Sequence, residues 1–224
     1  MNIFALSECP EESAKQMIDK HVIKMPTETC QMLHTNLLYF QFPKEQGKEP
    51  TLAELKAFHV ASGSKLMKPA MLNHPSTIWA RQSRENYMWL YEHGLALCEE
   101  YTYRYDKKHG TLKRIHEGIL EMHIINHHFF PTRGLTPVSI AMDDSFRIDL
   151  DTYSQRNPNW TGWDFVIASY RHYYLEGKWR IAEWRNDRRP EWFPSNWVAK
   201  KYNVGIRAYN AVEGRKYPKI LMEE

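Results

Sequence analysis

A sustained helical repeat of apolar residues between Ser83 and Gly110 is the feature that most constrains the fold of this chain. In "SRENYMWLYEHGLALCEEYTYRYDKKHG", apolar or small residues recur three or four positions apart, at Tyr87, Leu90, Tyr91, Gly94, Cys98, Tyr101 and Tyr105. This spacing places them on one face of a helix, and glycine is a residue type that commonly ends one. The segment therefore predicts a long buried helix closed by Gly110. At its distal end, Glu100, Arg104 and Lys108 are spaced to pair along the helix surface.

Similar periodicities predict a mainly α fold. Helices are expected at about 11–25, 27–40, 51–66, 112–128, 163–176 and 178–186. Residues 129–160 contain three prolines and no sustained helical period, so they predict a long ordered loop with room for one short strand pair. We expect one compact multi-helix domain, with a helical body over 1–128, the loop over 129–160 and a basic, aromatic C-terminal part over 161–224.

The hydropathy pattern predicts a soluble cytoplasmic protein. No apolar run approaches the roughly 20 residues that cross a bilayer, and the start "MNIFALSECPEE" lacks the basic and apolar regions of a signal peptide. The three cysteines have no CxxC spacing, so neither a disulfide framework nor a cysteine zinc site is expected.

One polar stripe lies in "MIDKHVIKMPTETCQML". On a helix at about 100° per residue, His21, Lys24, Glu28 and Gln31 fall within roughly 80° of one another, and apolar residues fill the opposite half. The stripe is either a solvated face or one wall of a cleft equipped for proton transfer or attack on an electrophile. Pro26 predicts a kink or a break that separates two helical pieces.

A second polar cluster occurs in "NHPSTIWARQSRENY", where His74 precedes a proline at a predicted helix entrance. The backbone N–H groups at this entrance can bind a phosphate with Arg81 as a bidentate partner, and Asn86 opens the long helix. The alternative is a capping turn followed by a surface arginine.

The basic charge is concentrated near the C-terminus. Residues 156–224 hold 13 Lys and Arg against 8 Asp and Glu, a balance of +5, and six of the eight tryptophans. Arginines among aromatic rings suit phosphate neutralisation and base stacking, but they also suit a small aromatic core under extended arginine side chains. Arg185, Arg189 and Trp192 are the candidate substrate-binding residues here.

The motifs of several enzyme classes are missing. His123 and His127 have the spacing of two metal ligands on a helix, with His116 near the same face, but Ile124 stands where a zinc protease requires glutamate. No third ligand is fixed by spacing, so no metal and no cofactor is predicted. The chain also lacks a P-loop, a GxGxxG turn and a GxSxG elbow.

Longer blocks of the sequence carry a resemblance. "MNIFALSECP", "DKHVIKMPTETCQML", "NHPSTIWARQSRENYMWLYEHGLALCEEYTYRY" and "RPEWF" look like parts of a set of small bacteriophage proteins, over most of residues 1–110 and the C-terminal turn. That likeness implies a bacteriophage origin but no activity.

The order of features also resembles the phage pyrimidine-dimer DNA glycosylase/AP lyase family of small all-α repair enzymes. The shared features are a first helix followed by a hydrophobic residue and proline, a long aromatic helix, and a late Arg-Pro-x-Trp-aromatic motif. The resemblance implies a nucleophilic N-terminal α-amine and a catalytic glutamate. Here Asn2 disfavours removal of Met1, and Lys24 occupies the place of the glutamate.

We therefore predict a DNA-acting enzyme that works on an extruded or modified pyrimidine base. Lys24 is the expected Schiff-base nucleophile, His21 or Glu28 shuttles the proton, and His74 completes the catalytic set. Gln31, Arg81, Asn86, Arg185, Arg189 and Trp192 are expected to bind the substrate or its phosphates. The alternatives are a transferase that hypermodifies DNA bases in the same pocket, a nucleotide-processing enzyme, and a non-catalytic protein that binds nucleic acid or a host protein.

Overall fold

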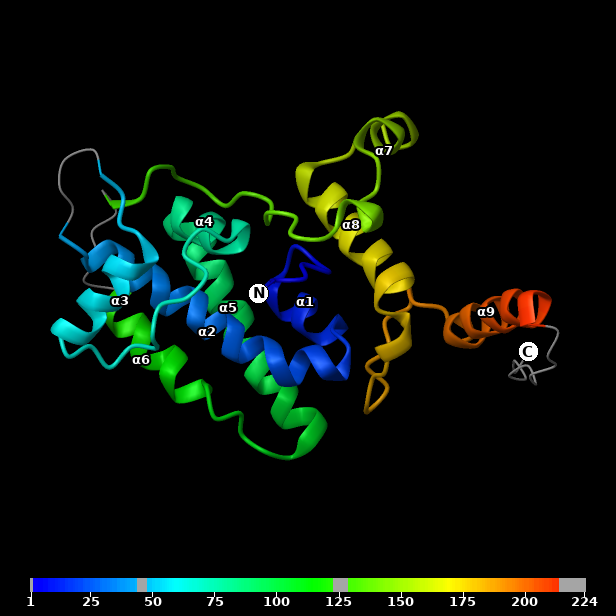
Figure 1. Ribbon diagram of the computed structural model, residues 1–224, viewed down its shortest axis with the longest axis horizontal. Coiled ribbons are helices and arrows are strands. Elements are labelled where there is room, and N and C mark those ends of the chain that lie inside the picture. Colours follow the sequence, from blue (N-terminus) through cyan, green and yellow to red (C-terminus); the bar gives the residue numbers. More distant parts are fainter. Residues whose placement is uncertain (1, 44–47, 123–128, 214–224) are drawn as a thin grey trace.

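Two long antiparallel helices form the centre of the protein. The computed structural model describes residues 2–43, 48–122 and 129–213. Helix α2 (Asp19–Gln41) packs along α5 (Arg84–Tyr105), and the two bury a leucine-rich seam between them (Figure 1). Gly94 makes this approach possible, because a Cβ there would lie 2.8 Å from the Thr29 side-chain methyl. The predicted long helix is confirmed as α5, but it does not extend to Gly110: it ends at Tyr105, where Asp106 adopts the left-handed cap conformation.

Shorter helices surround this pair on several sides. They are α1 (Pro10–Gln16), α3 (Leu52–Ala61), α4 (Pro75–Gln82) and α6 (Leu112–Met122). Local sequence explains their starts: Thr51 and Glu54 form a reciprocal capping box for α3, and the His74 ring accepts the Ser76 N–H at the entrance to α4. The helix expected over 51–66 ends earlier, and Gly63 follows in a left-handed conformation.

The prediction of two helices that meet at Pro26 is wrong. α2 runs through this proline without interruption. The missing hydrogen bond costs about 3 kcal/mol in a helix interior, but apolar side chains are buried on both sides of Pro26 and hold the helix together. The chain breaks earlier, at Met17 and Ile18, where both residues are extended.

The second half of the chain is also helical. A 3₁₀ turn (η2, Asp144–Phe146) and α7 (Leu150–Arg156) interrupt the expected loop 129–160, and the described residues of that loop form no strand. Then come α8 (Gly162–Gly177), the 3₁₀ turn η3 (Trp179–Ile181) and α9 (Trp197–Glu213). The helix expected over 178–186 is therefore only a short turn, whereas the one expected over 163–176 is confirmed as α8.

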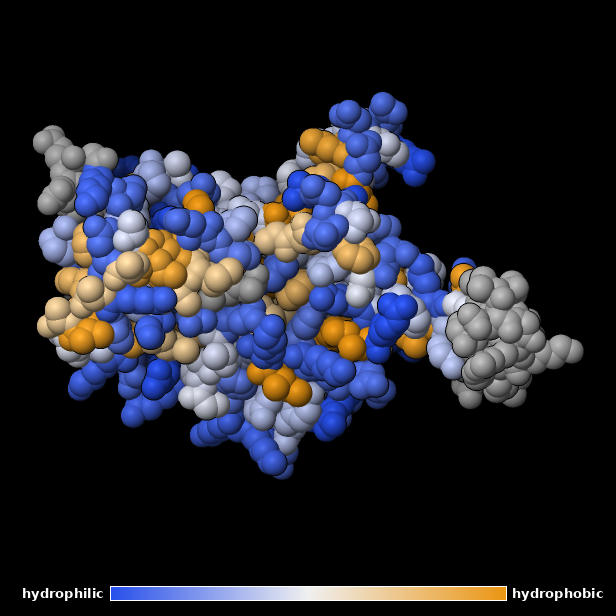
Figure 2. Space-filling model, viewed as in Figure 1, coloured by the Kyte–Doolittle hydropathy of each residue, from blue (hydrophilic) through white to orange (hydrophobic). Residues whose placement is uncertain are grey.

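The elements group into a helical body and a C-terminal arm. α8 lies beside α1 and the N-terminal segment, and α9 projects away from the body (Figure 1). Figure 2 shows a largely hydrophilic face with apolar side chains gathered at the α3 end. None of the helices within the described residues combines the length and the apolar character needed to span a bilayer. The mainly α fold predicted from the sequence is confirmed.

Candidate functional site

The N-terminal segment is held tightly against α2. Ile3, Ala5 and Leu6 are buried, and Phe4 adopts a left-handed φ of 52°. The Phe4 ring stacks on His21 with ring centroids 4.1 Å apart. A left-handed non-glycine residue is unfavourable, so the surrounding packing must impose this backbone path.

This path brings the start of the chain to Glu28. The backbone N–H of Asn2 donates to Glu28 Oε2 over 3.2 Å, across 26 residues of sequence. Lys24 Nζ lies 2.8 Å from the other carboxylate oxygen, Oε1. Two nitrogens therefore flank one carboxylate, which is the arrangement that can accept a proton from an amine and return it.

The members of the Lys24–Glu28 pair differ in their exposure to solvent. The Lys24 side chain is 69% exposed, whereas that of Glu28 is 15% exposed. A large substrate can reach the amine, and the carboxylate behind it is shielded by protein. Gln31, one turn further along α2, is half-buried on the same side.

His74 shares the electrostatic environment of Glu28. Burial lowers the pKa of the His74 imidazole, and the Glu28 carboxylate opposes that effect. His74 Nδ1 is already occupied as an acceptor for the Ser76 N–H at 3.2 Å. Its other ring nitrogen has no hydrogen-bond partner among the described residues. Glu28 therefore pairs with Lys24 and also interacts electrostatically with His74.

An exposed apolar residue stands beside this neighbourhood. Met71 has a left-handed φ of 52° and is 47% exposed. Its neighbour Ala70 exchanges hydrogen bonds with the Thr35 hydroxyl, and that hydroxyl also donates to the Gln31 carbonyl. These contacts fix the Met71 backbone next to the Gln31–Thr35 turn of α2, which follows Glu28.

His21 does not join the other members of the predicted stripe. Its ring is buried, with Nδ1 2.7 Å from the Tyr174 hydroxyl and the Phe4 ring stacked against it. Burial lowers the pKa of His21 to about 3, so the imidazole is neutral near pH 7. In this position His21 acts as a hydrogen-bonded part of the core.

Arg81 and Asn86 lie away from the Lys24–Glu28 pair. Arg81 donates to the Leu72 carbonyl over 2.6 Å, stands over the Tyr39 ring and lines an open hollow of about 400 Å³. Asn86 is buried, and its amide joins the Trp79 carbonyl to Thr136. Through these hydrogen bonds, Asn86 links α5 to the loop that follows residue 129.

The three C-terminal candidates are spread over one segment. Arg185 contacts Asp19 and covers the Tyr105 ring, while Trp192 donates to the Gln16 side chain over 2.7 Å. Arg189 is exposed at the rim of a separate hollow of about 440 Å³. Two of the three therefore contribute to packing of the C-terminal segment on the body.

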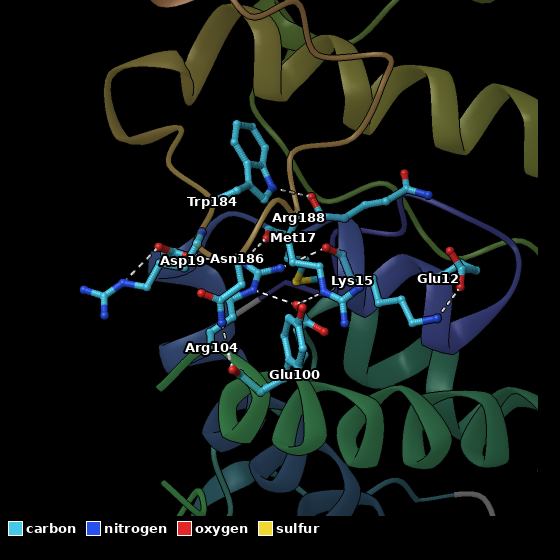
Figure 3. Close-up of polar contacts among 12 residues, drawn as sticks. Glu12, Lys15, Met17, Asp19, Glu100, Arg104, Trp184, Asn186 and Arg188 are labelled. Carbon is cyan, nitrogen blue, oxygen red and sulfur yellow. Dashed lines mark hydrogen bonds and ion pairs between the residues drawn. The ribbon is translucent and has the colours of Figure 1, made fainter. Parts of the chain in front are cut away.

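A buried ion network beneath this segment was not anticipated. Arg104 is fully buried and donates to Glu100 and Asp19, and also to the carbonyls of Lys15 and Met17 (Figure 3). Arg188 adds a second bond to Glu100 over 3.0 Å. The expected pairing of Glu100 with Arg104 one turn along the helix is confirmed. The pair is buried, however, because the α1–α2 turn and the C-terminal segment cover it.

The part of the chain that the structure describes contains no cluster of metal-ligating side chains. No three His, Cys, Asp or Glu side chains there are grouped to hold an ion. His123 and His127, which carry the suggestive spacing, lie outside the described residues, and His116 contacts the Tyr91 hydroxyl.

Asn2 is the member of the site that the sequence did not reveal. Its only signal was a polar residue that precedes the apolar run "IFAL". Without the long-range path of the N-terminal segment, nothing in the sequence connects it with Glu28.

Comparison with known protein families gives one match. The model of a family described as pyrimidine dimer DNA glycosylase matches residues 1–113, half of the 224 residues. Neither the curated proteins nor the solved structures contain a significant match. The matched half includes Asn2, Lys24, Glu28 and His74.

Proposed function

The chain belongs to the pyrimidine dimer DNA glycosylase family, and from this premise we propose that it excises a damaged pyrimidine and cleaves the abasic strand through Lys24. The observation that carries the proposal is the 2.8 Å contact between the exposed Lys24 amine and the shielded Glu28 carboxylate. An amine and a proton acceptor at hydrogen-bond distance are the minimum equipment for Schiff-base chemistry.

The proposed reaction begins at the sugar. Glu28 accepts a proton from the Lys24 ammonium, and the freed lone pair forms a bond to C1′. The base departs with the electrons of the glycosidic bond and takes up a proton. Opening of the sugar ring then gives an imine between Lys24 and C1′.

Strand cleavage follows from the imine. Removal of a C2′ proton allows the C3′–O bond to break, and the 3′ phosphate leaves with the bonding electrons. Water hydrolyses the imine and restores the lysine. Glu28 and His74 are the groups that we assign to proton transfer in these steps, because Glu28 lies 2.8 Å from the amine and His74 interacts electrostatically with Glu28.

A target base must leave the duplex before an amine can reach its sugar. Met71 supports this requirement, since an exposed apolar side chain beside the site can occupy the space of an extruded base. Exposed lysine and arginine side chains that can bind phosphates lie on α2 itself, at Lys20 and Lys24, and on two segments beside it, at Lys65 and Lys68 and at Lys113 and Arg114. We assign the DNA track to this surface, which adjoins Lys24, rather than to the C-terminal arginines.

Contacts along α2 hold these segments together. The Thr27 and Thr111 hydroxyls are 3.2 Å apart, and His34 binds both the Arg114 carbonyl and the Met67 N–H. The cations therefore border one face of the helix that carries Lys24 and Glu28.

Borohydride trapping on abasic-site duplex DNA tests the proposal. Wild-type protein should give a covalent adduct that peptide mapping places on Lys24, and Lys24→Met should abolish it. Lys24→Arg is the matched control, because it keeps the charge opposite Glu28 but removes the nucleophilic amine. Undiminished trapping or strand cleavage by Lys24→Met, or an adduct on another residue, contradicts the assignment of Lys24.

A further inference from the structure

A closed ring of hydrogen bonds ties Asn2 to the second half of the chain. The Asn2 side-chain amide donates to the Ala141 carbonyl over 2.6 Å, and the Ala141 N–H donates to the Tyr170 hydroxyl over 3.1 Å. The Tyr170 hydroxyl lies 2.8 Å from Asn2 Oδ1 and 3.2 Å from the Ser139 carbonyl, and it donates in turn to the nearer acceptor, Asn2 Oδ1. Each of the three residues is both a donor and an acceptor in this ring.

The ring depends on the chemistry of these side chains. Only an amide of this length offers a donor to Ala141 and an acceptor to Tyr170 at once. Burial raises the pKa of Tyr170, so its hydroxyl keeps the proton that it donates. Tyr170 is fully buried on α8, where packing fixes its ring.

The same asparagine orients the carboxylate of the site. Its backbone N–H donates to Glu28 Oε2, the oxygen that does not face Lys24. Rotation of the Asn2 backbone would break this bond, which contributes to the present orientation of the Glu28 carboxylate. The side-chain ring opposes this rotation by holding Asn2 at two atoms, Nδ2 and Oδ1.

We propose that Tyr170 is a positioning residue of the reaction, which acts through Asn2 to hold Glu28 in place opposite Lys24. The inference rests on the proposed function for its catalytic consequence. It extends the site beyond the family match, because Ala141 and Tyr170 lie outside residues 1–113. The second half of the chain would thus set the geometry of chemistry performed by the first half.

Tyr170→Phe tests the inference, with Tyr174→Phe as the matched control. Tyr174 is equally buried one turn along α8, but its hydroxyl contacts His21 instead of Asn2. We expect Tyr170→Phe to lower kcat for abasic-strand cleavage roughly tenfold or more, with KM unchanged, since small misplacements of reacting groups are costly. Tyr174→Phe should lose similar thermal stability but keep kcat within about twofold.

A double-mutant cycle distinguishes a loss of Glu28 positioning from a general disturbance of the fold. If Tyr170 acts through Glu28, Tyr170→Phe should cause no further loss of kcat when Glu28→Gln is already present. Independent, multiplying losses would overturn the inference. Equal effects of Tyr170→Phe and Tyr174→Phe on kcat would overturn it as well.

A measurement that requires no DNA tests the positioning role even if the proposed chemistry is wrong. Exchange of the Asn2 amide proton with water, followed by NMR, reports the bond to Glu28 directly. Tyr170→Phe should speed this exchange at least tenfold and Tyr174→Phe should not, with tenfold corresponding to about 1.4 kcal/mol of lost protection. A wild-type protein that gives no adduct with abasic DNA refutes the proposed function, whereas unchanged Asn2 exchange in Tyr170→Phe refutes the positioning role.

Discussion

Lys24 and Glu28 lie one turn apart on the same side of α2, with Lys24 Nζ 2.8 Å from Glu28 Oε1. An ion pair between an exposed lysine and a neighbouring carboxylate contributes at most about 1 kcal/mol to stability. The contribution of this pair to the stability of the fold is therefore small.

Glu28→Gln should separate the proposed catalytic role of Glu28 from its role in stability. The amide keeps the size of the side chain and still accepts the Asn2 N–H, but it cannot take a proton from Lys24. We expect the single-turnover rate of abasic-strand cleavage to fall by about 10²–10⁴, the usual contribution of a general acid–base group. Thermal unfolding and duplex binding should change little, and cleavage at the wild-type rate would contradict the role of Glu28.

Local periodicity was sufficient to predict helices such as α5 and α8, but not the contacts between distant segments. The repeat through Tyr87, Leu90 and Gly94 predicts α5 because burial of one helical face depends on near neighbours only. The stripe on α2 also placed Lys24 and Glu28 together correctly. It could not show that His21 turns into an aromatic cluster, since Phe4 and Tyr174 reach it from distant parts of the chain.

The features that the sequence did not predict depend on contacts between residues far apart in the chain. A proline in isolation predicts a break, but burial on both sides of Pro26 keeps α2 continuous. The actual break near Met17 is held by Arg104, which is 87 residues away. Likewise, the bond between Tyr170 and Asn2 spans 168 residues. No spacing rule within one segment can reveal such contacts.

Arg104→Met should destabilise the protein severely. The substitution leaves the buried carboxylates of Asp19 and Glu100 without their main partner, and loss of one member of a buried ion pair costs about 3–5 kcal/mol. Urea unfolding should show this loss. Lys15→Met is the control, since it breaks only the exposed pair with Glu12, and it should stay within about 0.5 kcal/mol of wild type. Similar losses in the two variants would contradict the importance of the Arg104 network.

Stability should fall as the pH drops below 6.5. His93 is buried against the Trp89 ring, and neither ring nitrogen has a partner among the described residues. Burial lowers the pKa of His93 to about 3 from 6.5. Between these values the unfolded chain binds a proton that the folded chain does not, so acid favours unfolding by up to about 1.4 kcal/mol per pH unit.

His93→Phe should flatten this acid dependence. Phenylalanine keeps the stacking on Trp89 and removes both unpaired nitrogens, so the stability at pH 7 should be equal to or above that of wild type. Urea unfolding between pH 7 and pH 4 measures the slope. His21 retains its own lowered pKa in the variant, so a part of the dependence should remain. An unchanged slope in His93→Phe would contradict the assignment.

Duplex binding should depend on the cations around α2 more than on those of the C-terminal segment. If Lys68 and Lys113 each contact a phosphate, replacement by Gln should weaken binding and reduce the slope of log K against log salt by about 0.9 per residue. Arg189→Gln, which removes an exposed cation of the C-terminal segment, is the comparison and should leave the slope unchanged. Fluorescence anisotropy with undamaged and abasic duplexes over a range of salt concentrations provides both numbers. A loss confined to Arg189→Gln would move the DNA track to the C-terminal arginines, and an absence of salt dependence in the wild type would argue against DNA as the substrate.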